Sequence, residues 1–288
     1  MKYQRVGLHV SASGGVINAP DRAKEIGAEC FQFFSRSPRG GIAPKISEED
    51  AKLFVQRCQQ HEMESYIHTP YYINFAAPKK DIAENTIRVV REEMERATQL
   101  GVKYVVTHLG SARDWPGAEK GKTPGGALKR TIKGLRAVLH GNPKFTARLL
   151  LEISAGTGSI IGNSFEELAY IIKGLGKKNM QVCLDTCHMF SAGYDLRTKE
   201  ALDETMKQFR EQLGLERLKL VHINDSKTGL GELKDRHEHI GLGKIGEEGF
   251  KTLLAHPDFQ SVNFVLETKH DDLIKQDMER LKEWRVVK

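Results

Sequence analysis

Short apolar segments alternate with longer amphipathic segments along the whole 288-residue chain. The apolar segments are typical of buried β-strands, because they are short and rich in branched and aromatic residues. They are VGLHV (6–10), CFQFF (30–34), SYIH (65–68), YVVTH (104–108), LLLEI (149–153), QVCLD (181–185), LKLVHI (218–223) and NFVLE (263–267).

The segments between and after these strands show helical periodicity. They span 18–28, 47–61, 81–101, 126–140, 164–176, 198–214, 246–256 and 271–284. Residues that cap helix N-termini stand at four of their starts. These are Ser47, Asp81, Ser164 and Thr198, and Ser164 has capping-box spacing to Glu167.

Strict alternation of strands and helices indicates βαβ units and a parallel sheet. An open doubly wound sheet usually carries G-x-G-x-x-G after its first strand. Here the corresponding segment, HVSASGG (9–15), lacks that motif. No linker-like segment interrupts the alternation, so we predict one (β/α)₈ TIM barrel domain over residues 1–288.

Composition narrows the function only slightly. The net charge of +6 suits a polyanionic partner but is too modest to establish one. The sequence lacks an apolar stretch of the roughly 18 residues that a membrane span needs, and MKYQRVGLHV does not resemble a signal peptide. Four cysteines in so long a chain are not a disulfide framework. We therefore expect a cytoplasmic protein without a membrane partner.

Six successive predicted strands carry a His, Asp or Glu at or near the carboxyl end. These residues are His68, His108, Glu152, Asp185, His222 and Glu267. In a barrel, the carboxyl ends of the strands form the rim on which active sites are built. Three further candidates lie in the loops after the sixth and seventh strands: His188, Asp235 and His237.

Each of these residues taken alone has an ordinary structural interpretation, such as a loop histidine or a salt-bridged glutamate. The strand interiors, however, offer almost no cations to pair with the carboxylates, which would repel one another if they converged. A divalent cation removes that cost, and mixed imidazole and carboxylate ligands favour zinc or manganese over magnesium. One ion needs about four ligands, so nine candidates predict a cluster of ions.

The sequence resembles the endonuclease IV family of zinc-dependent apurinic/apyrimidinic endonucleases. The motifs are HVSASGG (9–15), HTPYYIN (68–74), LDTCHMFSAGYDLRT (184–198), HINDSK (222–227), DRHEHIGLGKIG (235–246) and LET (266–268). The resemblance implies a TIM barrel with three zinc ions per chain, one of which manganese could replace. The implied ligand sets are His68, His108 and Glu152; Glu152, Asp185, His222 and Glu267; and His188, Asp235 and His237.

The resemblance also implies hydrolysis of the phosphodiester 5′ to an abasic site in duplex DNA. The products would be a 3′-hydroxyl and a 5′-deoxyribose phosphate, and a 3′-end-cleaning phosphodiesterase activity is expected beside it. Glu152 would bridge two ions and orient the attacking hydroxide. Arg39, Tyr71 and Tyr72 match the family's DNA-penetrating positions, although two tyrosines beside a strand end are also compatible with an ordinary core lid. A monomer is expected.

The chain departs from the family pattern beside several motifs. Ile153 and Ser154 follow Glu152 where Asn-Thr is usual, Leu109 replaces a common proline, and Lys269 follows the last motif. Tyr72 stands where an aliphatic residue is common. None of these changes replaces a predicted ligand, so they bear on loop geometry and substrate range.

Two other functions remain open from the sequence. A metal-dependent sugar isomerase or epimerase of the same barrel superfamily would use Glu152, Asp185, His222 and Glu267 around one metal. It would have no use for His188, Asp235 and His237 as a set. A non-catalytic DNA-binding module is the other alternative. Metal stoichiometry separates the first from the nuclease, and a nicking assay separates the second.

Overall fold

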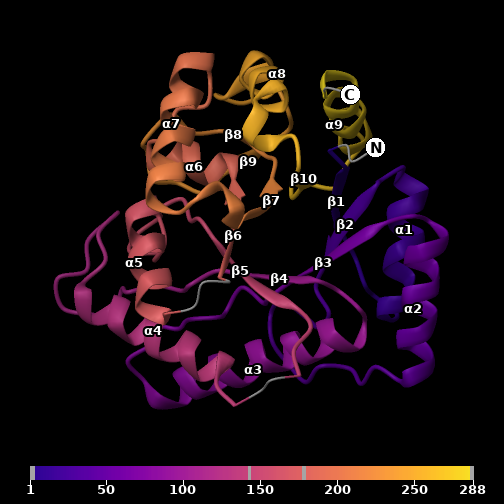
Figure 1. The fold of residues 1–288 in the computed structure, drawn as a ribbon, viewed down its shortest axis with the longest axis horizontal. Coiled ribbons are helices and arrows are strands. Elements are labelled where there is room, and N and C mark those ends of the chain that lie inside the picture. Colours follow the sequence, from indigo (N-terminus) through magenta and orange to yellow (C-terminus); the bar gives the residue numbers. More distant parts are fainter. Residues whose placement is uncertain (1–3, 142–143, 177–179, 286–288) are drawn as a thin grey trace.

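The computed structural model describes residues 4–141, 144–176 and 180–285, and within them eight parallel strands close into a barrel (Figure 1). The strands are β1 (Val6–Val10), β2 (Cys30–Phe33), β3 (Glu64–His68), β4 (Tyr104–Thr107), β5 (Arg148–Glu152), β6 (Gln181–Asp185), β7 (Leu218–His222) and β10 (Asn263–Leu266). Neighbours in this order pair, and β10 closes the ring by pairing with β1, with Val6 opposite Phe264. The predicted (β/α)₈ barrel is confirmed.

Helices surround the barrel (Figure 1). They are α1 (Ala19–Ile26), α2 (Glu48–Gln60), α3 (Lys80–Gln99), α4 (Gly125–Leu139), α5 (Phe165–Leu175), α6 (Thr186–Ala192), α7 (Lys199–Gln212), α8 (Gly246–Ala255) and α9 (Ile274–Trp284). Short 3₁₀ turns are η1 (Val16–Asn18), η2 (Leu215–Arg217) and η3 (Pro257–Phe259). Among the residues that the structure describes, no helix is both long and apolar enough to cross a membrane.

Three of the four predicted helix caps are correct. Ser47, Ser164 and Thr198 each accept a hydrogen bond from a backbone N–H of the first turn. The prediction for Asp81 was wrong, because α3 begins at Lys80 and Asp81 lies inside its first turn. An acidic residue is favourable in the first turn as well, since it faces the positive end of the helix dipole. An aspartate in the sequence therefore locates the start of a helix only to within one or two residues.

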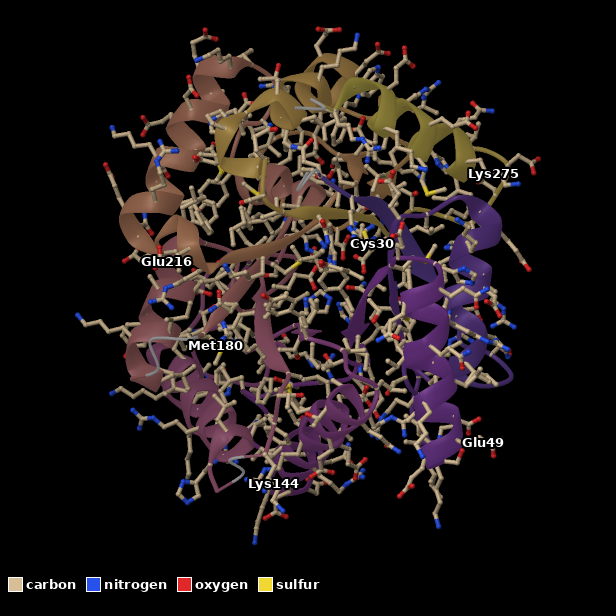
Figure 2. All side chains as sticks on the ribbon, turned by 45° about the vertical axis from the view of Figure 1, so that its right-hand side comes forward. Cys30, Glu49, Lys144, Met180, Glu216 and Lys275 are labelled. Carbon is tan, nitrogen blue, oxygen red and sulfur yellow. The ribbon has the colours of Figure 1, made fainter. Side chains whose placement is uncertain are left out.

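Two layers of apolar side chains hold the barrel together, one inside it and one between the strands and the helices. The inner layer comprises Cys30, Tyr66, Val106, Leu150, Cys183, Leu220 and Val265. Figure 2 shows Cys30 near the centre of the molecule, whereas the labelled charged side chains lie at its periphery. Because the interior is filled, the polar residues at the carboxyl ends of the strands lie on a closed floor rather than in a channel.

Three short elements that the sequence did not predict position site residues. Helix α6 begins directly after β6. In the loop after β7, the short strands β8 (Asp225–Ser226) and β9 (His237–Glu238) pair antiparallel, with Asp225 opposite Glu238. The two strands are too short to leave a periodic signal in the sequence, and all three elements lie at the carboxyl end of the barrel.

Candidate metal centre

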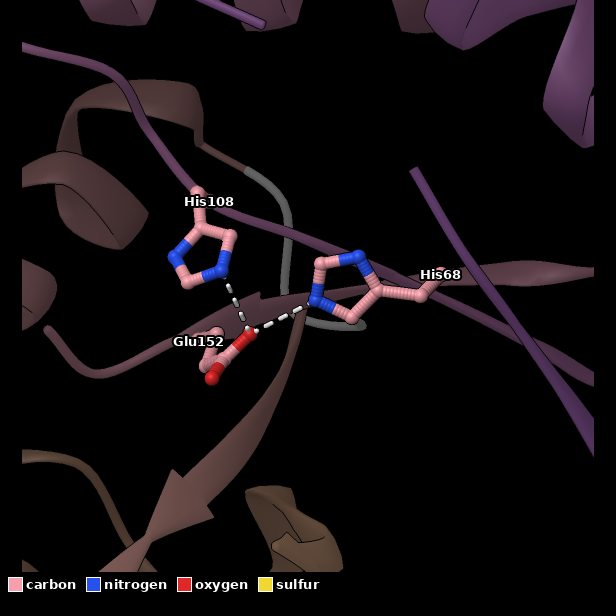
Figure 3. A group of neighbouring side chains, drawn as sticks. All are labelled: His68, His108 and Glu152. Atoms are coloured by element: carbon pink, nitrogen blue, oxygen red, sulfur yellow. Dashed lines mark hydrogen bonds and ion pairs between the residues drawn. The ribbon is translucent and has the colours of Figure 1, made fainter. Parts of the chain in front are cut away.

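Glu152 lies at the centre of the site, fully buried at the end of β5. One of its oxygens, Oε2, lies 3.1 Å from Nε2 of His68 and 3.5 Å from Nε2 of His108 (Figure 3). His68 donates a hydrogen bond from Nδ1 to the carbonyl of Thr69 at 2.6 Å, which directs Nε2 towards Glu152. The first predicted ligand set is therefore assembled around a single carboxylate oxygen.

The other oxygen of Glu152 faces a second group. Nδ1 of His222 lies 3.1 Å from Glu152 Oε1 and 3.2 Å from Glu267 Oε2. Together with Asp185, these residues offer four ligand atoms that all lie within 4.8 Å of one another. Glu152 thus presents one oxygen to each group, which is the arrangement of a carboxylate that bridges two ions.

Electrostatics keep the central carboxylates ionised despite their burial. Burial raises the pKa of Glu152, but the neighbouring His108 and His222 outweigh it and hold this pKa well below its ordinary value. Burial likewise opposes ionisation of Glu267, and the charge and hydrogen bond of His222 hold the pKa of Glu267 well below its usual range. Both carboxylates are therefore ionised and available as ligands for a cation.

A third group lies beside the first two. The carboxylate of Asp235 lies 3.3 Å from Nε2 of His188 and 3.3 Å from Nε2 of His237. Both of these Nε2 atoms are buried, and their contacts with Asp235 do not have hydrogen-bond geometry. Leaving a buried polar atom unpaired is costly, whereas a metal ion would use both nitrogens. The donor set, two imidazoles and a carboxylate, suits zinc.

Cys187 is a neighbour of this third group that the ligand prediction did not include. Its sulfur lies within 4.8 Å of ligand atoms of Asp235 and His237. Burial raises the pKa of this thiol to about 12, so the thiol is protonated at neutral pH. Cys183 and Cys187 are both completely buried.

Asp185 joins the strand end to the helix that follows it. Its Oδ1 accepts a hydrogen bond from the backbone N–H of His188 at 2.8 Å, which makes Asp185 the N-cap of α6. The first turn of that helix places His188 beside Glu152, and Nδ1 of His188 donates to the carbonyl of Ile153 at 2.9 Å. This contact leaves Nε2 to face Asp235.

The loop that carries Asp235 and His237 folds around a different carboxylate, that of Asp225. It accepts hydrogen bonds from five backbone N–H groups, at distances from 2.7 to 3.2 Å. The donors are Ser226, Gly241, Gly243, Ile245 and Gly246. A Cβ at Gly243 would lie only 2.5 Å from Asp225 Oδ1, so glycine is required there for the backbone to approach the carboxylate.

Two residues that support the predicted ligands were not identified from the sequence. Gln32 accepts a hydrogen bond from Nε2 of His222 at 2.9 Å and donates one to Glu267. Asn224 donates to Asp185 at 2.7 Å and accepts from the backbone N–H of Glu267 at 2.8 Å. A signal existed for Gln32, because it is a lone polar residue within the apolar strand CFQFF.

The predicted DNA-contacting residues lie around the same rim. Arg39 is exposed in the loop between β2 and α2. Tyr71, 66% exposed, packs edge-on against Phe34 with ring centroids 5.1 Å apart. Tyr72 is only partly buried and packs against the hydrophobic core. The ring of Tyr71 is therefore accessible to a ligand, whereas the ring of Tyr72 also covers part of the hydrophobic core.

Known proteins that resemble this chain in sequence and structure belong to one family and fold. A family model described as xylose isomerase-like TIM barrel matches residues 20–284. A probable endonuclease 4 of Carboxydothermus hydrogenoformans is 39% identical over 281 residues, covering 97% of this chain and 96% of that protein. The crystal structure of endonuclease IV from Thermus thermophilus superposes with a TM-score of 0.85 at 32% identity, covering 97% of this chain and 98% of that one.

A D-tagatose 3-epimerase-like protein has the same fold, with a TM-score of 0.71 at 19% identity over 96% of each chain. That likeness extends to the barrel alone, whereas the match to endonuclease IV holds in sequence and structure over nearly the whole chain. The resemblance found in the motifs is thereby confirmed, and the chain belongs to the endonuclease IV family.

Proposed function

We propose that this chain, an endonuclease of the endonuclease IV family, hydrolyses the phosphodiester 5′ to an abasic site in duplex DNA. The products would be a 3′-hydroxyl and a 5′-deoxyribose phosphate. The observation that carries the proposal is the division of the Glu152 carboxylate between two groups of ligand atoms, with a third group beside them. Such an arrangement suits a phosphate that several positive charges must hold and polarise at once.

Three zinc ions would be held by the three groups. The first would take His68, His108 and Glu152; the second Glu152, Asp185, His222 and Glu267; the third His188, Asp235 and His237. When bound, such ions lower the pKa of a water molecule and neutralise charge that develops on a phosphate. Manganese is an alternative at one position, because imidazole and carboxylate ligands bind both metals.

The protein's own groups set the geometry of this centre. Glu152 uses both oxygens, because Oε2 faces His68 and His108 while Oε1 faces His222. It would therefore help to hold both of the first two ions and to orient the attacking water. The backbone contacts of His68 and His188 fix which nitrogen of each ring faces the centre.

Duplex DNA would lie across the rim, where a sugar phosphate must leave the helix to reach the centre. Arg39, which is exposed on the β2–α2 loop, would contact a phosphate or enter the duplex. Tyr71 offers an exposed ring for stacking on a base. Tyr72 supports it from its partly buried position. We further propose that the protein acts as a cytoplasmic monomer and also removes blocking groups from 3′ ends.

The test is cleavage of a duplex with one tetrahydrofuran abasic analogue. Wild-type protein loaded with zinc is expected to nick the duplex on the 5′ side of the analogue, and a chelator should abolish nicking. Glu152→Gln should lower the single-turnover rate on the order of 10³-fold, because it removes a charge at the reacting centre. If the zinc-loaded wild type leaves the duplex intact, the proposed activity is wrong.

The second candidate function, sugar isomerisation or epimerisation, is favoured by one observation only, the shared fold with a D-tagatose 3-epimerase-like protein. The third ligand group counts against it, because a single ion in the second group would leave the buried Nε2 atoms of His188 and His237 without a hydrogen bond of good geometry. Assay of ketose epimerisation beside the nicking assay separates the two functions.

A further inference from the structure

The loop between β2 and α2 has a rigidly anchored base. Arg36, at its start, donates from Nη2 to Glu92 at 2.7 Å and from Nε to the fully buried Glu93. Arg96 donates to the hydroxyl of Ser35 at 2.6 Å and to the carbonyl of Pro44 at 2.7 Å, thereby joining both ends of the loop to α3. A buried, mutually hydrogen-bonded network of this kind fixes geometry, because breaking any part leaves a buried charge unpaired.

The tip of the same loop exposes a large apolar side chain. Ile42 is 99% exposed, the highest value among the large hydrophobic residues of the described chain. Gly40 and Gly41 precede it with φ angles of 120° and 99°, which other residues rarely adopt. The chain thus turns sharply at the tip and holds an isoleucine in water, where its apolar surface is unfavourable.

The loop borders Tyr72 near its tip and the first ligand group at its base. A Cβ on Gly40 would lie 4.0 Å from the ring of Tyr72. At the base of the loop, the ring of Phe34 contacts both Tyr71 and His68, with centroid distances of 5.1 and 5.5 Å. Ile42 is therefore carried on the loop that borders the exposed tyrosine and the first ligand group.

The charge of the loop favours one kind of partner. Residues 35–46 contain no aspartate or glutamate, and Arg39 and Lys45 are exposed cations, whereas Arg36 is already paired with Glu92 and Glu93. A basic loop with an apolar tip suits duplex DNA, because cations hold the phosphates while an apolar side chain separates two base steps. An apolar protein surface would gain nothing from the flanking positive charges.

We propose that Ile42 is an apolar wedge that enters the base stack next to the abasic nucleotide. This inference rests on the proposed function. Because its base is anchored, the loop would keep its conformation when Ile42 enters the base stack. Arg39 would bind a phosphate of the DNA backbone nearby. Energy spent on unstacking would be recovered because the opened duplex lets the sugar phosphate reach the centre.

The test compares wild type, Ile42→Ala, Ile42→Leu and the control Ile82→Ala, which removes an isoleucine 40% exposed on α3. Each zinc-loaded protein is assayed at subsaturating concentration, under single-turnover conditions, on two duplexes with a tetrahydrofuran analogue. In one duplex the neighbouring base pairs are intact. In the other, a mismatch next to the analogue has already weakened the stack. A 2-aminopurine beside the analogue reports unstacking.

Ile42→Ala should cleave the intact duplex about tenfold more slowly and give a smaller 2-aminopurine signal, since an apolar wedge is lost. On the mismatched duplex it should approach the wild-type rate. Ile42→Leu and Ile82→Ala should match wild type on both. A rate for Ile42→Ala that is unchanged, or lowered equally on both duplexes, overturns the wedge. Failure of wild type on both duplexes would instead refute the proposed function.

Discussion

Nε2 of His222, on β7, donates a hydrogen bond to the side-chain oxygen of Gln32, on β2, across 2.9 Å. This contact holds the imidazole so that Nδ1 faces Glu152 and Glu267. Gln32 also donates to Glu267 and lies 3.1 Å from Nδ1 of His9. One amide therefore orients two of the predicted ligands.

Gln32→Leu should lower zinc affinity about 10–100-fold, because residues that orient metal ligands typically contribute that much. Competition with a chromogenic chelator measures the change. Gln4→Leu is the matched control, since Gln4 is a buried glutamine whose amide donates to the carbonyls of Leu254 and Phe259 instead. It should reduce stability and leave zinc affinity unchanged. Equal zinc affinities for Gln32→Leu and wild type would show that Gln32 does not orient the metal ligands.

His188→Ala should reduce the zinc content from near three ions per chain to near two. The third group would keep only Asp235 and His237, fewer ligands than a stable zinc site needs. Elemental analysis of dialysed protein gives the stoichiometry. His61→Ala, at the end of α2 with an ion pair to Asp21, should leave it unchanged. A wild type that binds a single ion would favour the isomerase alternative.

Asp225→Asn should destabilise the protein by about 2–3 kcal/mol, because an amide cannot accept all five backbone N–H bonds and leaves buried donors unpaired. Denaturant unfolding measures this free energy. The exposed Asp114, whose partner is Arg113, offers the control Asp114→Asn, which should change stability little. If both variants unfold at the same denaturant concentration, the hydrogen bonds of Asp225 do not stabilise the loop that carries Asp235 and His237.

Glu29 should make stability depend on pH. Burial raises its pKa, but hydrogen bonds from Arg285 and the backbone of Val6 outweigh this and lower the pKa below 4.5. A carboxyl whose pKa is depressed on folding stabilises the folded state above its unfolded pKa and loses that effect as pH falls. The difference in unfolding free energy between wild type and Glu29→Gln should thus be largest near pH 7 and shrink below about pH 4.5.

A constant difference from pH 7 to pH 3 would contradict this account of Glu29. Arg285 is the C-cap of α9, and Val6 begins β1. The same experiment therefore measures how much the contacts of Glu29 between the last helix and the first strand contribute to stability.

The barrel was predictable because each strand and helix carries its own periodic signal. The strand-end positions of His68 and Asp185 followed from the fold, since parallel strands place their carboxyl ends on one rim. That the nine residues bind metal stays a prediction, although the structure brings them together.

The supporting contacts could not be predicted, because they join residues far apart in sequence. Gln32 and His222 are separated by 190 positions, and only the closed ring brings them together. Helix α6 was missed because its seven residues are almost all buried and therefore show no amphipathic pattern.

The capping of α6 by Asp185 has a consequence for how this chain can vary. Because Asp185 starts the helix and His188 lies in its first turn, their three-residue separation is dictated by backbone geometry as well as by any metal. One residue added between them would swing the imidazole about 100° around the helix axis and away from Glu152. Insertions should therefore be tolerated in the outer loops but not between Asp185 and His188.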